Sequence, residues 1–156
     1  MFLKNRLTKE QALEKIKHYC SYQERCHSEV KDKLYSYNLR KIKVDEIISQ
    51  LIENNYLNEE RFAIQFARGK FRMKNWGRKK IQYELQQKGV NSFIIKMALK
   101  EIDEEKYFDT LQKLAQTKWN ALHVESKLVR QSKTNAYLLQ KGYEQTLISQ
   151  VLSRMK

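Results

Sequence analysis

The 156-residue chain contains no proline, only four glycines and only two cysteines. A sheet-rich fold needs many tight turns built from Gly, Pro, Asn and Asp, so this scarcity argues against one. Two cysteines cannot form a disulfide framework, which favours a reducing compartment. No run of eighteen apolar residues is present, and the polar start of the chain does not resemble a leader. We therefore expect a cytoplasmic protein that does not enter a membrane.

Carboxylates are scarce relative to cations. The chain carries 31 Lys and Arg against 18 Asp and Glu, a formal net charge of +13. Residues 56–102 hold 11 cations and four carboxylates, and residues 61–83 hold no carboxylate at all. Such a basic chain suits a polyanion, either nucleic acid or an anionic membrane surface. Nucleic acid is favoured, because no long helix pairs a basic face with an apolar aromatic one.

Apolar residues recur at spacings of three and four, which is the pattern of amphipathic helices. Ile47, Ile48, Leu51 and Ile52 form one such stripe. Hydrophobic residues make up 41% of the chain, enough for a packed core. Short polar breaks separate the stripes, so the sequence predicts an all-α fold of roughly nine helices.

Three helix-ending residues indicate an internal repeat. Gly89 and Gly142 each follow a lysine and close an apolar stripe, as a residue in the left-handed conformation does. Asn38 fits the same role, because Asn is the next-best residue for that conformation. The three positions are 51 and 53 residues apart, and apolar residues recur at the same offsets from each. A leucine, for example, lies four residues before each of them.

A period near fifty residues predicts three tandem three-helix repeats in an elongated or curved array. The expected boundaries are residues 1–57, 58–102 and 103–156. Such an array offers a long surface that can follow an extended partner. The middle repeat is expected to be the most basic.

The first candidate binding residues form a ridge in the middle repeat. At 100° per residue, three arginines lie on one side of a helix, beside an apolar stripe that we expect in the core. Arginines so placed suit bidentate contacts with phosphate or carboxylate groups. The ridge is Arg61, Arg68 and Arg72, with Lys74 on another side of the helix, and the apolar stripe is Phe62, Phe66 and Met73.

A second cluster of cations follows Gly77, which we expect to cap a helix. Arg78, Lys79 and Lys80 then fill the first helical turn, where each cation costs about 0.3–1 kcal/mol against the helix dipole. Free N–H groups and three cations would converge there on one anion-binding site, although a solvated run of charge is the alternative. The neighbouring Trp76 is a candidate for stacking on a nucleobase, while packing at a helix junction is the commoner role.

The sequence contains no pattern typical of catalysis. His18, Cys20, Cys26 and His27 lie close together, but five residues separate the cysteines where structural zinc sites prefer two. Neither a GxxxxGK[ST] phosphate loop nor a Gly-x-Ser-x-Gly element is present. We expect no catalytic residue, no metal site and no cofactor, and hence a protein that is not an enzyme.

The middle of the chain resembles the core motif of the RecX family. The resemblance lies in LNEERFA at 57–63, FAR at 66–68, WGRKKI at 76–81 and ELQQKGV at 84–90. The later LLQKGY at 138–143 resembles the end of that family's third repeat. Taken in order over this length, the pattern is fairly specific to the family.

The resemblance implies an all-helical regulator of the RecA recombinase, with a role in recombination, DNA repair and the SOS response. Members are thought to bind in the groove of the RecA–single-stranded DNA filament and to restrain its extension, ATP hydrolysis and strand exchange. By their positions in the motif, the resemblance implies that six residues contact either DNA phosphates or RecA carboxylates. These residues are Arg61, Arg68, Arg72, Arg78, Lys79 and Lys80.

The alternative is a free-standing helical DNA-binding regulator of transcription. Such a protein would read double-stranded DNA, and a symmetric operator usually requires a dimer. The sequence shows no obvious dimerisation helix, so we expect a monomer that binds single-stranded and, as a further candidate, double-stranded DNA.

Overall fold

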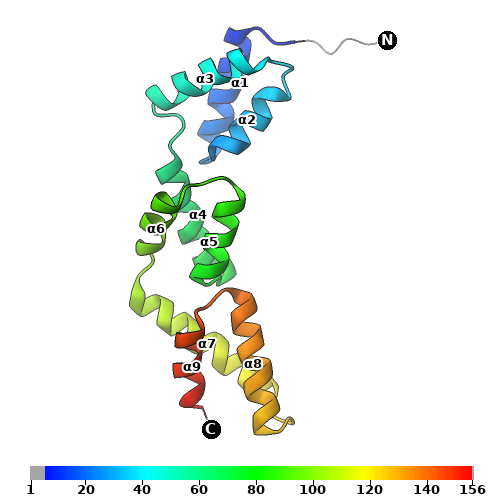
Figure 1. The fold of residues 1–156 in the computed structure, drawn as a ribbon, viewed down its shortest axis with the longest axis vertical. Coiled ribbons are helices and arrows are strands. Elements are labelled where there is room, and N and C mark those ends of the chain that lie inside the picture. The colour runs from blue at the N-terminus through cyan, green and yellow to red at the C-terminus, as the bar shows by residue number, and fades with distance from the viewer. Residues whose placement is uncertain (1–5, 156) are drawn as a thin grey trace, which may run out of the picture.

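The computed structural model describes residues 6–155, which fold into nine α-helices without a β-strand (Figure 1). This confirms the all-α prediction. The helices are α1 (Lys9–Tyr22), α2 (His27–Tyr35), α3 (Lys41–Glu53), α4 (Glu59–Lys74), α5 (Arg78–Gln87), α6 (Ser92–Lys100), α7 (Glu104–Ala121), α8 (Lys127–Lys141) and α9 (Gln145–Ser153). In this part of the chain, no helix combines the length and the apolar character that crossing a bilayer requires.

Side-chain caps explain where several helices begin. Asn58 accepts a hydrogen bond from the Arg61 amide at 2.9 Å, and Asn91 accepts one from the Ile94 amide at 2.9 Å. Each cap satisfies an amide that the first turn of a helix would otherwise leave unpaired. Thr8, Asp103 and Ser126 cap α1, α7 and α8 in the same way.

The helices form three successive units of three, arranged along an elongated molecule (Figure 1). After the second helix of each unit, one residue takes the left-handed conformation: Asn38 at φ 64°, Gly89 at φ 81° and Gly142 at φ 101°. Burial follows the predicted offsets, because the leucine four residues earlier is fully buried in every unit. The predicted repeat is therefore confirmed.

The second and third units share one continuous hydrophobic core, to which the first unit adds Cys26. The other buried residues of the first unit pack in a separate core. Tyr107 of α7 and Tyr143, just after α8, are fully buried, with ring centroids 5.1 Å apart. One predicted core residue is wrong, because Met73 is 77% exposed. On α4 the packed face runs instead through Ala63 and Ala67, whose small side chains let α6 approach.

Polar contacts join the first unit to the second. Glu24 lies 2.7 Å from Arg61 of α4, and Nδ1 of His27 lies 2.9 Å from Glu59. The Ser28 hydroxyl donates to the Lys88 carbonyl at 3.0 Å. These contacts position the most basic unit relative to the N-terminal one.

The two cysteines are buried thiols. Burial raises the pKa of the Cys20 thiol to about 11. Cys26 lies at the start of α2, where its Sγ is 3.0 Å from a carboxylate oxygen of Glu29. Both thiols therefore contribute to packing, and Cys26 also caps α2.

Candidate nucleic-acid interface

The start of α5 and the end of α8 meet through their backbones. The Gly77 amide donates to the Lys141 carbonyl at 2.8 Å, and the Lys79 amide donates to the Gly142 carbonyl at 2.9 Å. A Cβ atom on Gly77 would lie 2.3 Å from the carbonyl carbon and oxygen of Gly142. Gly77 caps α5 as predicted, and its lack of a side chain allows this contact between the second and third units.

The expectation that the α5 amides are free to bind an anion is wrong for the first two of them. The Arg78 amide donates to the Tyr107 hydroxyl at 3.0 Å, and the Lys79 amide is taken by Gly142. The third unit therefore occupies the first two N–H groups of the helix. Sequence alone could not show this, because the partners lie 29 and 63 residues away.

Arg78 is also held within the structure. Its guanidinium lies 2.8 Å from Glu144 and 2.6 Å from Glu104, and its Cζ lies 3.9 Å from the centre of the Tyr107 ring. The Tyr107 hydroxyl donates to Glu144 in turn, and burial together with that hydrogen bond raises the pKa of Tyr107. Arg78 thus links the second unit to the third.

The arginine ridge is divided in the same way. Arg61 donates to Glu24 and also to the Asn55 side chain at 3.0 Å, and Arg68 lies 2.9 Å from Glu101. Arg72 forms no ion pair among residues 6–155. Two of the three predicted ridge arginines are therefore already paired with carboxylates.

Lysines without carboxylate partners gather at the junction instead. Lys74, Lys80 and Lys141, here called the lysine cluster, form no ion pair within the described chain. The Lys141 ammonium donates to the Lys74 carbonyl at 2.8 Å. Burial, together with the positive charges of Lys80 and Lys74, lowers the pKa of Lys141. Such a concentration of uncompensated charge attracts anions. Lys79, exposed on the same turn as Lys80, is likewise unpaired in residues 6–155.

Trp76 lies against this cluster. The Nζ atoms of Lys80 and Lys70 lie 4.6 and 5.0 Å from its ring centroid, and Phe66 packs against it at 6.4 Å. The ring is partly buried and helps to position two ammonium groups. Stacking of Trp76 on a base stays a prediction.

Sequence reasoning missed Lys141 as a site residue. It belongs to the recurring Lys-Gly element, so the repeat itself carries a signal for it. The signal is incomplete, because only the fold brings the end of α8 against the start of α5.

Taken together, these features define a class of protein: an all-helical array of three-helix units, with lysines concentrated where two units join. Family models for the second and third three-helix domains of RecX match residues 58–99 and 104–152. The chain belongs to the RecX family.

Relatives and solved structures agree with this assignment. Over 138 residues the chain is 30% identical to "Regulatory protein RecX" of Bacillus cytotoxicus and 30% identical to that of Oceanobacillus iheyensis. Each match covers 88% of this chain and 51% of the relative, so the chain spans about half the length of these relatives.

The crystal structure of RecX from Lactobacillus salivarius superposes with a TM-score of 0.87 at 26% identity, covering 94% of this chain and 96% of that one. A second crystal structure of a regulatory protein RecX gives 0.85 at 22% identity, covering 94% of this chain and 72% of that one. At that lower identity, the second likeness concerns the fold alone.

Proposed function

We propose that this chain is a non-enzymatic regulator of RecA that acts in the cytoplasm as a monomer. It binds the RecA–single-stranded DNA filament and inhibits filament extension, ATP hydrolysis and strand exchange. Membership of the RecX family supports the partner. The single observation that carries the mode of binding is the unpaired lysine cluster at the junction of the second and third units.

Charge and shape support this mode together. An extended array can lie along a filament, and the lysine cluster with Lys79 and Arg72 supplies cations that no carboxylate of residues 6–155 neutralises within 4 Å. Arg61 and Arg78 contribute by holding neighbouring units together, and Arg68 by an ion pair within the second unit. Any contact that these arginines make with the filament competes with their carboxylate partners. Binding through phosphates is expected to be independent of sequence.

The test is a titration of RecA ATP hydrolysis on single-stranded DNA with the purified chain. We expect hydrolysis to fall as the chain is added, with saturation at or below one chain per RecA. An unchanged rate across the titration would contradict the proposal. A protected footprint on one particular duplex sequence would instead support a free-standing transcription regulator.

A further inference from the structure

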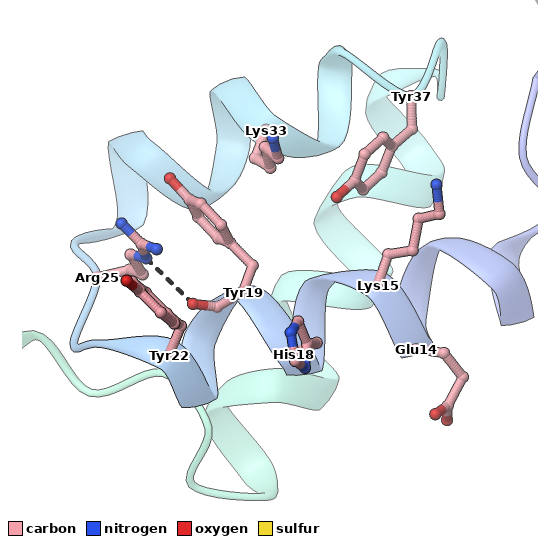
Figure 2. A pocket seen from close by; sticks show the side chains of 8 residues that line it. All are labelled: Glu14, Lys15, His18, Tyr19, Tyr22, Arg25, Lys33 and Tyr37. Atoms are coloured by element: carbon pink, nitrogen blue, oxygen red, sulfur yellow. Dashed lines mark hydrogen bonds between the residues drawn. The ribbon is translucent and has the colours of Figure 1, made fainter.

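The first unit carries a hollow lined by aromatic and cationic side chains, at a site separate from the lysine cluster (Figure 2). Its volume is about 550 Å³, within the range typical of small-ligand sites. Helix α1, the following loop, α2 and the turn after α2 all contribute to it. The lining residues are Glu14, Lys15, His18, Tyr19, Tyr22, Arg25, Lys33 and Tyr37.

Cations lie over the rings in this hollow. The Arg25 guanidinium carbon is 3.7 Å from the centre of the Tyr19 ring, and the Lys33 ammonium is 5.4 Å from the same centre. Lys15 lies 5.8 Å from the centre of the Tyr37 ring. Arg25 is fixed further by its hydrogen bond to the Tyr19 carbonyl at 3.1 Å (Figure 2). The rings therefore hold positive charge at the edge of the hollow.

These cations have no carboxylate partner within the described residues. Glu14 is the one carboxylate that lines the hollow, and Figure 2 shows its carboxylate directed away from the tyrosine rings. Burial raises the pKa of Tyr19 and of Tyr37, so both phenols stay neutral at physiological pH. The hollow is therefore a positively charged site with apolar walls.

Tyr22 gives the hollow an open aromatic face. Its side chain is 80% exposed, and no cation of residues 6–155 lies over its ring. Figure 2 places Tyr22 with Arg25 at one end of the hollow and Tyr37 with Lys15 at the other. An exposed tyrosine ring beside unpaired cations combines a stacking surface for a base with a contact for the adjoining phosphate.

We infer that this hollow binds one nucleotide of single-stranded nucleic acid, with the base stacked on Tyr22 and the phosphate held by Arg25 and Lys33. Duplex DNA does not fit this role, because its bases are stacked on each other. An acidic peptide would use the cations but leave the Tyr22 ring without a partner. The inference rests on the proposed function in one respect: both take single-stranded DNA as the ligand.

The test compares affinities for a thymine oligonucleotide and for an abasic oligonucleotide of the same length and phosphate number. The wild-type chain should prefer the strand that carries bases. Tyr22→Ala should lower affinity for the thymine strand by about fivefold to tenfold while leaving the abasic strand unaffected. Tyr22→Trp should retain the preference. Tyr35→Ala, which removes an exposed tyrosine of the same unit outside the hollow, is the matched control.

Equal affinity of wild type for the two strands, or an unchanged thymine affinity in Tyr22→Ala, would overturn the inference. A third result would also overturn the inference and indicate a protein ligand. In that result, an acidic peptide competes with the oligonucleotide equally well in Tyr22→Ala and in wild type, and neither protein prefers the strand that carries bases. The ATPase titration separates this inference from the proposed function. If the chain inhibits RecA but shows no preference for the strand with bases, the proposed regulator role is supported and the nucleotide site is overturned. If the chain prefers the strand with bases but does not inhibit RecA, the nucleotide site is supported and the regulator role is overturned.

Discussion

Replacing Gly77 by Ala should separate the second unit from the third. The added Cβ would lie 2.3 Å from the Gly142 carbonyl carbon and oxygen and 2.5 Å from the Tyr143 amide nitrogen. These are backbone atoms, so no side-chain rotation relieves the overlap. The φ angle of Gly77 is −78°, which alanine adopts without strain, so contact between the units is the cause of the expected effect.

The cost follows from what must move. Overpacking of a closely packed site costs about 1–3 kcal/mol. Separating the backbones also weakens the hydrogen bonds from the Gly77 and Lys79 amides, at about 1 kcal/mol each. We expect Gly77→Ala to lower the free energy of unfolding by about 3–5 kcal/mol. At 2–4 °C per kcal/mol, the melting temperature should fall by roughly 10 °C.

The chain offers a matched control in Gly69. This glycine lies within α4, and a Cβ built on it meets nothing within 4 Å. Gly69→Ala should therefore raise stability by about 0.5–1 kcal/mol, because alanine is the better helix former. The same chemical change is thus expected to have opposite signs at two positions eight residues apart.

Urea unfolding followed by circular dichroism measures both variants, and hydrogen exchange locates the effect. Exchange in Gly77→Ala should rise most in α4 to α9 and least in α1 and α3, because most buried residues of the first unit pack in a separate core. A Gly77→Ala protein as stable as wild type would refute the assignment of this junction as a close backbone contact.

Two further predictions concern Arg78 and Cys20. Arg78→Ala should lower the free energy of unfolding by about 2 kcal/mol, because it removes a charged hydrogen bond to Glu144. The control, Lys79→Ala, should change the free energy of unfolding by less than about 0.5 kcal/mol. Equal melting temperatures for the two variants would contradict this prediction. The Cys20 thiol should resist a thiol reagent at pH 8 in the folded protein and react readily in urea, because burial raises its pKa to about 11. The pKa of Cys20 in the folded protein exceeds the ordinary 9.0, so the contribution of the protonated thiol to folding stability is complete below about pH 9 and is lost by about pH 11. Cys20→Ala should therefore show a smaller fall in stability between about pH 9 and pH 11 than wild type.

The repeat architecture could be predicted from sequence because it depends on local chemistry. A residue able to adopt positive φ ends each second helix, and Asn38 could be recognised as equivalent to Gly89 and Gly142 from the buried positions around it. The spacing of apolar residues and the choice of turn residue depend only on neighbours within one unit, so both can be recognised from the sequence alone.

The pairing of the cations could not be predicted in the same way. A stretch free of carboxylates looks unpaired in sequence, yet Arg61 and Arg78 find carboxylates 37 and 66 residues away. The first two amides of α5 likewise find partners in the third unit, the Tyr107 hydroxyl and the Gly142 carbonyl. The distribution of charge along the sequence was enough to predict which unit is the most basic. The contacts between units determine which of its cations are free to bind an anionic partner.

The most direct test of the lysine cluster compares two double variants of equal charge. Lys74→Glu with Lys80→Glu changes the cluster, while Lys96→Glu with Lys113→Glu removes the same charge from exposed positions elsewhere on α6 and α7. Glutamate at position 80 lies in the first turn of α5, where it suits the helix dipole, so the fold should persist.

The measurement is the affinity of each variant for the RecA–single-stranded DNA filament across a range of salt concentrations. We expect the cluster variant to bind at least about tenfold more weakly than the control, and its log–log salt slope to be shallower by about 1.4, because two phosphate contacts are lost. Equal affinities and equal slopes for the two double variants would contradict the assignment of the lysine cluster as the filament contact.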